Sequence, residues 1–245
     1  MDAIYWMLLV SVSGPLVGAL IGILHHPKPL VLANMLSFAA GVMISISFLN
    51  LIPESLALAP FWVFFLGSLF GAFVMFSLDR TLPHIHPQLG RAEQGMKLKR
   101  TAIYLIIGMF LHNFPEGIAL AIGTLSETKT MFAIAIAIAV HNIPEGICTS
   151  APYFAATKNR AKAFFYAATT VLPIIAGFFA AKLLFVHLTP YLIAAVMAAT
   201  AAIMIYISAD ELIPFSCNKD HSHWDHSVIF SLLFGVLFVV MLNSW

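Results

Sequence analysis

Eight apolar runs are spread over the whole chain, and most are long enough to cross a membrane as a helix. Crossing roughly 30 Å of hydrocarbon takes about 20 residues at 1.5 Å per residue. Inside a bilayer the backbone polar groups must bond to one another, which a helix achieves within a single segment. The sequence therefore predicts an all-α integral membrane protein with eight transmembrane helices, the last of which is short enough that an interfacial helix is the alternative. The predicted spans are Ile4–Leu24, Leu30–Leu51, Phe61–Leu78, Ala102–Gly123, Met131–Ala151, Ala163–Leu184, Leu192–Ala209 and Val228–Leu242.

The composition agrees with a chain that is surrounded by lipid. Hydrophobic residues make up 61% of the chain and charged residues 9%, against about 45–50% and about 25% in soluble domains. A net charge of +1 gives no support to nucleic-acid binding. The first run begins just after Asp2 with no Lys or Arg before it, which favours a retained span over a signal peptide.

Lysine and arginine are distributed unevenly among the connections. If the N-terminus lies outside, ten of the twelve basic residues fall on the cytoplasmic side. Because basic connections stay in the cytoplasm, both termini are predicted to lie outside a plasma (inner) membrane. The long cytoplasmic loop over residues 79–101 separates membrane helices 1–3 (residues 1–78) from membrane helices 4–8 (residues 102–245), within one membrane domain overall.

A six-residue pattern, His-Asn-x-Pro-Glu-Gly, occurs at His112–Gly117 and again at His141–Gly146. Each copy lies near the middle of a predicted span, where a charged side chain costs at least about 2.5–3.5 kcal/mol on insertion scales. Neither span contains Lys or Arg, so one divalent cation is the predicted partner of the two glutamates. A single copy is also compatible with a kinked helix whose Asn is hydrogen-bonded, but two copies favour the cation site.

The spacing within the pattern arranges metal ligands on the helix surface. Residues four apart share a face, so the His and Glu of each motif stand together. Each Asn lies three residues before its Glu, which allows the two carboxylates to bridge two adjacent ions. Imidazole and carboxylate suit zinc, iron(II), manganese, cobalt or cadmium, whereas copper(I) prefers sulfur ligands. The candidate ligands are His112, Asn113, Glu116, His141, Asn142 and Glu145.

The proline of each motif is expected to contribute to the same site. Pro115 and Pro144 have no N–H to donate to the carbonyls of Leu111 and Val140. A kink with a free carbonyl oxygen beside each motif is therefore predicted.

These features resemble the ZIP (Zrt-, Irt-like protein) family of metal transporters, in particular the bacterial zinc-uptake members of the ZupT type. The paired motifs, the basic and His-bearing loop between the third and fourth spans, and the eight-span layout carry the resemblance. It implies that His112, Glu116, His141 and Glu145 form the main transport site, between helices 4 and 5, and that the two Asn join the carboxylates in a second site. It also implies a homodimer and an elevator-like movement of the site-bearing helices. No cofactor is implied, because the divalent metal is the transported substrate.

One position departs from the family pattern. Many members have a Glu-Pro pair in the sixth span whose Glu is a ligand of the second site, whereas this chain has Leu172-Pro173. A leucine side chain cannot coordinate a metal, and two divalent ions would then carry four positive charges against two negative ones. A weak second site is therefore expected, which Leu172→Glu should strengthen.

Polar residues near the span ends are candidates for ion entry and exit. Glu54 follows the second predicted span, and Asp210 and Glu211 follow the seventh; the family counterpart of Glu211 lies on the ion path. Solvated acids at helix ends are the alternative. His187 is expected to have no specific role. Histidines that are candidates for transient metal binding, with solvated loop histidines as the alternative, are His25, His26, His84, His86, His221, His223 and His226.

Three classes of function fit a metal site inside a membrane: uptake, export and metal-dependent hydrolysis. Moving a divalent ion inward across 100 mV yields about 4.6 kcal/mol at about 2.3 kcal/mol per charge. A nucleotide-binding GxxxxGK[ST] signature does not occur in the sequence, and neither does the HExxH pattern of metal hydrolases. The predicted function is uptake of zinc, or of iron, manganese, cobalt or cadmium, into the cytoplasm. A metal exporter is the first alternative and an intramembrane hydrolase the second, so the chain is predicted not to be an enzyme.

Overall fold

The computed structural model describes residues 3–25, 28–81, 113–124, 128–185, 187–217 and 226–244. Over these residues the ordered secondary structure is helical, without a strand. Seven helices in this part are long and apolar enough to cross a membrane. The helical membrane bundle is thus confirmed. The first half of the fourth predicted span lies outside the described residues, which begin again with a helix over 113–123, so the count of eight stays a prediction.

The helices follow one another with short connections in the described segments. In chain order they are α1 (Ala3–Leu24), α2 (Pro29–Ile46), η1 (Ser47–Leu51), α3 (Ile52–Leu58), α4 (Phe61–Thr81), the helix over residues 113–123, α6 (Thr128–Thr157), α7 (Arg160–Ala168), α8 (Val171–Phe185), α9 (Pro190–Ile207), η3 (Ser208–Leu212), α10 (Ile213–Ser216) and α11 (His226–Ser244). Each of η1 and η3 is one turn of π-helix.

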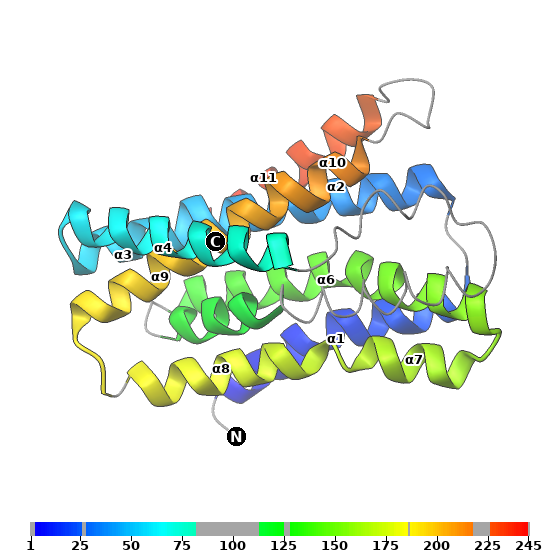
Figure 1. The fold of residues 1–245 in the computed structure, drawn as a ribbon, viewed down its shortest axis with the longest axis horizontal. Helices are drawn as coiled ribbons and strands as arrows, with labels where there is room; N and C mark the ends of the chain where they lie inside the picture. Colours follow the sequence, from blue (N-terminus) through cyan, green and yellow to red (C-terminus); the bar gives the residue numbers. More distant parts are fainter. Residues whose placement is uncertain are drawn as a thin grey trace.

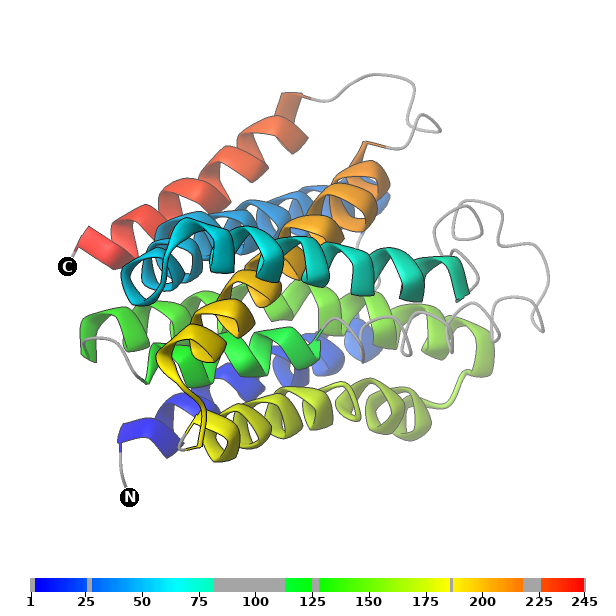
Figure 2. The same cartoon turned by 60° about the vertical axis from the view of Figure 1, so that its left-hand side comes forward.

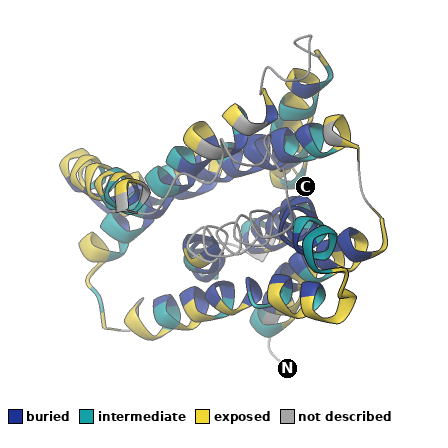
Figure 3. Cartoon of the chain, turned by 45° about the vertical axis from the view of Figure 1, so that its right-hand side comes forward, coloured by how far each residue is buried: buried dark blue, intermediate teal, exposed yellow. Residues whose placement is uncertain are grey.

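The helices form two blocks, which Figure 1 shows as an upper and a lower group. The site block consists of α1, the helix over 113–123, α6, α7 and α8; the second block consists of α2, η1, α3, α4, α9, η3, α10 and α11. Figure 2 shows the same separation from another side. Contact between the blocks includes α6 against α2 and α11. Buried residues face the middle of the bundle and exposed residues face outward in both blocks (Figure 3).

Glycines bring helices together within each block. A Cβ at Gly18 of α1 would overlap the carbonyl oxygen of Ile143, and one at Gly146 of α6 would overlap that of Pro15. Gly117 and Gly177 join the helix over 113–123 to α8 in the same way. Each glycine in the described part of the chain meets atoms of its own block. Small residues allow close backbone approach between membrane helices, so each block is tightly packed internally.

The helices α2 and α11 run parallel along their whole length. Ser37 donates a hydrogen bond to the carbonyl of Val228 at 2.7 Å near one end. Beyond the end of α2, Asn50 of η1 and Asn243 of α11 exchange two side-chain hydrogen bonds of 3.2 Å each. Both helices therefore begin at the same side of the bundle.

The second and seventh spans are longer than the sequence predicted. The helices continue beyond Leu51 to Leu58, and beyond Ala209 to Ser216, so the predicted ends were wrong. Ser47–Ser55 and Ser208–Ser216 share the pattern Ser-x-x-x-Leu-Ile-Pro-x-Ser, and each begins with a π-helical turn. The wider turn accommodates the proline two residues after it, which would otherwise clash with the preceding turn.

The remaining prolines do not end their helices. Pro144 and Pro152 lie inside α6, which continues to Thr157. The sixth span, in contrast, turns at Thr169 and Thr170 between α7 and α8, before Pro173. Glu54, which was expected to follow the second span, lies instead within the first turn of α3, where the helix continues.

Candidate metal centre

Three side chains from the two motifs meet in the interior of the site block. Glu116 comes from the helix over 113–123, and His141 and Glu145 come from α6. One ligand atom of each lies within 4.8 Å of the others. Their exposed fractions are 0%, 0% and 2%. Two carboxylates and an imidazole thus converge in a site removed from solvent and lipid.

The hydrogen bonds of His141 orient its ring toward the neighbouring carboxylate. Its Nδ1 lies 2.8 Å from the carbonyl oxygen of Ala137, and since a carbonyl only accepts, Nδ1 carries a proton. Its Nε2 lies 3.1 Å from Oε1 of Glu116. In the neutral ring the Nε2 lone pair then faces an anionic oxygen. A cation between the two atoms, either a proton or a metal ion, makes this arrangement favourable.

Asn142 also contacts the carboxylate of the other motif. Its Nδ2 donates to Oε2 of Glu116 at 2.7 Å. Spacing places Asn142 within reach of Glu145 on its own helix. It did not reveal this further hydrogen bond, which crosses to the helix over 113–123. Its Oδ1 is buried without a hydrogen-bond partner among the described residues. That oxygen is available to a metal ion.

Asn113 connects the candidate site to the turn in the sixth span. Its Nδ2 donates to the carbonyl oxygen of Thr170 at 2.8 Å. Its Oδ1, like that of Asn142, is buried with no hydrogen-bond partner in the described part. Sequence reasoning missed Thr170. The signal that could have found it is the Thr169-Thr170 pair, which lies shortly before Pro173 inside an otherwise apolar run.

Leu172 does not lie in this buried cluster. Its side chain is 56% exposed, whereas the Thr170 side chain two residues earlier is 2% exposed. A carboxylate introduced at position 172 would be attached to an exposed face of α8. The structure therefore gives no support to the expectation that Leu172→Glu strengthens a second site.

The other candidate residues are not brought to this cluster in the described part of the chain. Asp210 is exposed in η3. Glu211 belongs to the same turn, and its side chain is not among those that the structure describes. His25 and His226 are exposed at helix ends. The predicted ligand His112 and the histidines His26, His84, His86, His221 and His223 lie outside the described residues.

Comparison with known proteins decides the family. Residues 80–243 match the family described as ZIP zinc transporter. This chain belongs to the ZIP family. Three zinc transporters named ZupT, from Salmonella heidelberg, Salmonella newport and Escherichia coli, are each 41% identical to it, with 86% of each chain covered.

Membership in the ZIP family sets the general activity. The chain is a transporter of divalent metal and not an enzyme, so the hydrolase alternative is excluded. Its apolar helices and its relatives identify it as an integral protein of the inner membrane.

Proposed function

We propose that this ZIP transporter carries zinc into the cytoplasm through a site made of Glu116, His141 and Glu145. The observation that carries the proposal is the meeting of these three buried ligand atoms from two motifs within 4.8 Å. By the same proposal, His112 supplies a further imidazole, and Asn113 and Asn142 supply amide oxygens on the neighbouring side.

The geometry and charge of the cluster favour a divalent ion. Zinc binds nitrogen and oxygen ligands at about 2.0–2.2 Å, so the ligand atoms around one zinc lie at most about 4.4 Å apart. Small side-chain rotations bring a 4.8 Å cluster into that range. Two carboxylates neutralise the charge of one such ion. The same ligands are compatible with iron(II), manganese, cobalt and cadmium, which we include in the proposed substrate range.

The direction of transport follows from the membrane potential. A divalent ion that moves inward across 100 mV releases about 4.6 kcal/mol, and uptake therefore needs no nucleotide. The site belongs to one block, and α6 contacts α2 and α11 of the second block. We propose that the site block moves relative to the second block to expose the ion to each side in turn, with Glu211 on the path.

The proposal includes the assembly and topology. Exposed apolar side chains cover α4 and α11, which supports contact with lipid and with a second copy in a homodimer. The loop over residues 79–101 is proposed to be cytoplasmic, and both termini to lie outside. The positive charge of that loop and of the α6–α7 connection supports this orientation. Figure 2 places the end of α4 and the α6–α7 turn on one side of the bundle.

Cysteine labelling in intact cells tests the orientation. After Cys217, which is exposed, has been replaced by Ser, a cysteine at Asn159 should react with a membrane-impermeant reagent only after permeabilisation. A cysteine at His187 should react without it, because the α8–α9 connection lies on the other side of the bundle. Labelling of the Asn159 cysteine in intact cells would contradict the proposed topology and place that connection outside.

Metal titration of purified protein tests the site. One tightly bound zinc per chain is expected, and Glu145→Ala should abolish it because a ligand and half of the neutralising charge are lost. Leu172→Glu should leave one tight zinc, since its side chain starts from an exposed face. Two tight zinc ions in wild type, or an additional tight ion in Leu172→Glu, would contradict this arrangement.

A further inference from the structure

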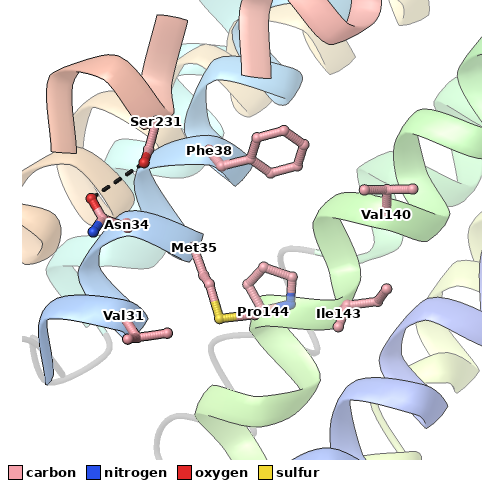
Figure 4. A pocket seen from close by; sticks show the side chains of 8 residues that line it. All are labelled: Val31, Asn34, Met35, Phe38, Val140, Ile143, Pro144 and Ser231. Atoms are coloured by element: carbon pink, nitrogen blue, oxygen red, sulfur yellow. Dashed lines mark hydrogen bonds between the residues drawn. The ribbon is translucent and has the colours of Figure 1, made fainter. Parts of the chain in front are cut away.

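A groove lies where the two blocks meet, beside α6. Its volume is about 410 Å³, and it is bounded by α2 and α11 of the second block and by α6 of the site block. Figure 4 shows its lining from close by. The lining residues are Val31, Asn34, Met35, Phe38, Val140, Ile143, Pro144 and Ser231.

The wall of the groove is almost entirely apolar, and its few polar atoms are largely bonded to one another. Oδ1 of Asn34 accepts hydrogen bonds from Ser227 at 3.0 Å and from Ser231 at 3.2 Å. Figure 4 shows the second of these bonds at the edge of the groove. Such a wall offers no carboxylate, imidazole or thiolate to a metal ion. The groove lining thus lacks the carboxylate and imidazole ligands that form the metal cluster.

The position of the groove specifies what surrounds it. All eight lining residues belong to segments that are long and apolar enough to span a membrane. From Val31 to Phe38 the groove extends about 10 Å along α2 at 1.5 Å per residue, a large part of one leaflet's share of roughly 30 Å of hydrocarbon. An apolar groove at this depth is next to acyl chains, not water.

Basic residues mark the end of the groove that faces the membrane surface. Because α2 and α11 run parallel, both begin there. Lys28 is exposed directly before α2, three residues before Val31, and His226 is exposed at the start of α11. A lysine at this level attracts the phosphate of a phospholipid headgroup.

From these observations we infer that the groove binds one acyl chain of a phospholipid whose phosphate lies beside Lys28. The lipid belongs to the leaflet in which α2 and α11 begin. Its chain contacts Val31 and Met35 on one side and Ile143 and Pro144 on the other.

This lipid occupies the junction that the proposed transport movement must change. The glycine-mediated backbone contacts of the described residues lie within the blocks, whereas this junction contains a groove. The acyl chain fills that space and remains fluid, so α6 can move past α2 without opening a void. This consequence rests on the proposed function, but the binding of the lipid does not.

Photo-crosslinking in nanodiscs tests the lipid site. A phospholipid with a diazirine in its acyl chain should label peptides that contain Val31–Phe38 and Val140–Pro144. Val31→Trp places a large ring in the groove and should reduce this labelling to the level of general lipid contact. Leu30→Trp changes the neighbouring residue, which does not line the groove, and should leave the labelling unchanged. Equal labelling in the two variants would show only general lipid contact and would overturn the proposal.

A second pair of variants keeps the test valid if Val31→Trp does not fold. Native mass spectrometry of detergent-purified protein should retain a phospholipid on wild type and on Lys162→Gln, which changes an exposed lysine of α7, and lose it on Lys28→Gln. Equal retention of phospholipid by the Lys28→Gln and Lys162→Gln variants would show that Lys28 does not hold the headgroup and would contradict the inference. Zinc titration of the same samples separates the two proposals. If the proposed metal site is wrong, the zinc titration will show it while lipid retention still follows Lys28.

Discussion

Substitution of Glu116 by alanine should reduce zinc uptake into proteoliposomes to the rate of protein-free vesicles. Glu116 receives hydrogen bonds or ion contacts from both His141 and Asn142, so its loss removes a metal ligand and the group that orients the others. Loss of a residue that only orients a metal ligand typically costs about 10–100-fold. The loss of uptake in Glu116→Ala should therefore exceed about 100-fold.

A variant outside the site separates this effect from general damage. His187→Ala changes an exposed residue in the α8–α9 connection and should transport at the wild-type rate. Both proteins should reach the membrane in equal amounts. Zinc flux near the wild-type value in well-expressed Glu116→Ala would refute the assignment of the transport site.

Substitution of Gly18 by alanine should disrupt the packing of α1 on α6. The added Cβ would overlap the carbonyl oxygen of Ile143 and press on the backbone of Gly146, and backbone cannot move aside as a flexible side chain can. Overpacking of this kind typically costs about 1–3 kcal/mol. We expect a lower melting temperature in detergent, and weaker zinc binding because Ile143 lies in the motif that carries His141 and Glu145.

Gly123→Ala provides the matched control for this prediction. A Cβ there would meet first the Cδ1 atom of Ile134 at 3.2 Å, the flexible end of a side chain. The same chemical change should therefore leave melting and zinc binding close to wild type. If Gly18→Ala and Gly123→Ala have equal melting temperatures, the close α1–α6 contact does not hold the site block together.

The sequence predicted the membrane helices well, for physical reasons that are local. Long apolar runs leave only helices as an option in a bilayer, and the described helices contain or overlap the predicted spans. Two unneutralised glutamates in mid-membrane required a partner, and Glu116 and Glu145 do meet. The helices depend on the composition of single segments, whereas the meeting of the two glutamates depends on how two helices pack.

The pairing of individual side chains could not be read from spacing. Helical spacing places Asn142 near Glu145 but could not show that it also donates to Glu116 on another helix. The approach of two helices depends on glycines, and what those glycines meet belongs to the partner helix. The exposure of Leu172 depends on the turn at Thr169 and Thr170 in the same way. The π-helical turns that extend the second and seventh spans were missed because a proline usually ends a helix.

Anomalous scattering at the zinc edge from crystals of the zinc-loaded protein tests the central proposal most directly. One strong peak is predicted at about 2.0–2.2 Å from Nε2 of His141 and from carboxylate oxygens of Glu116 and Glu145. The same peak should be absent from crystals of Glu116→Ala. A zinc peak at other residues, with none between these three side chains, would contradict the transport site proposed for this ZIP protein.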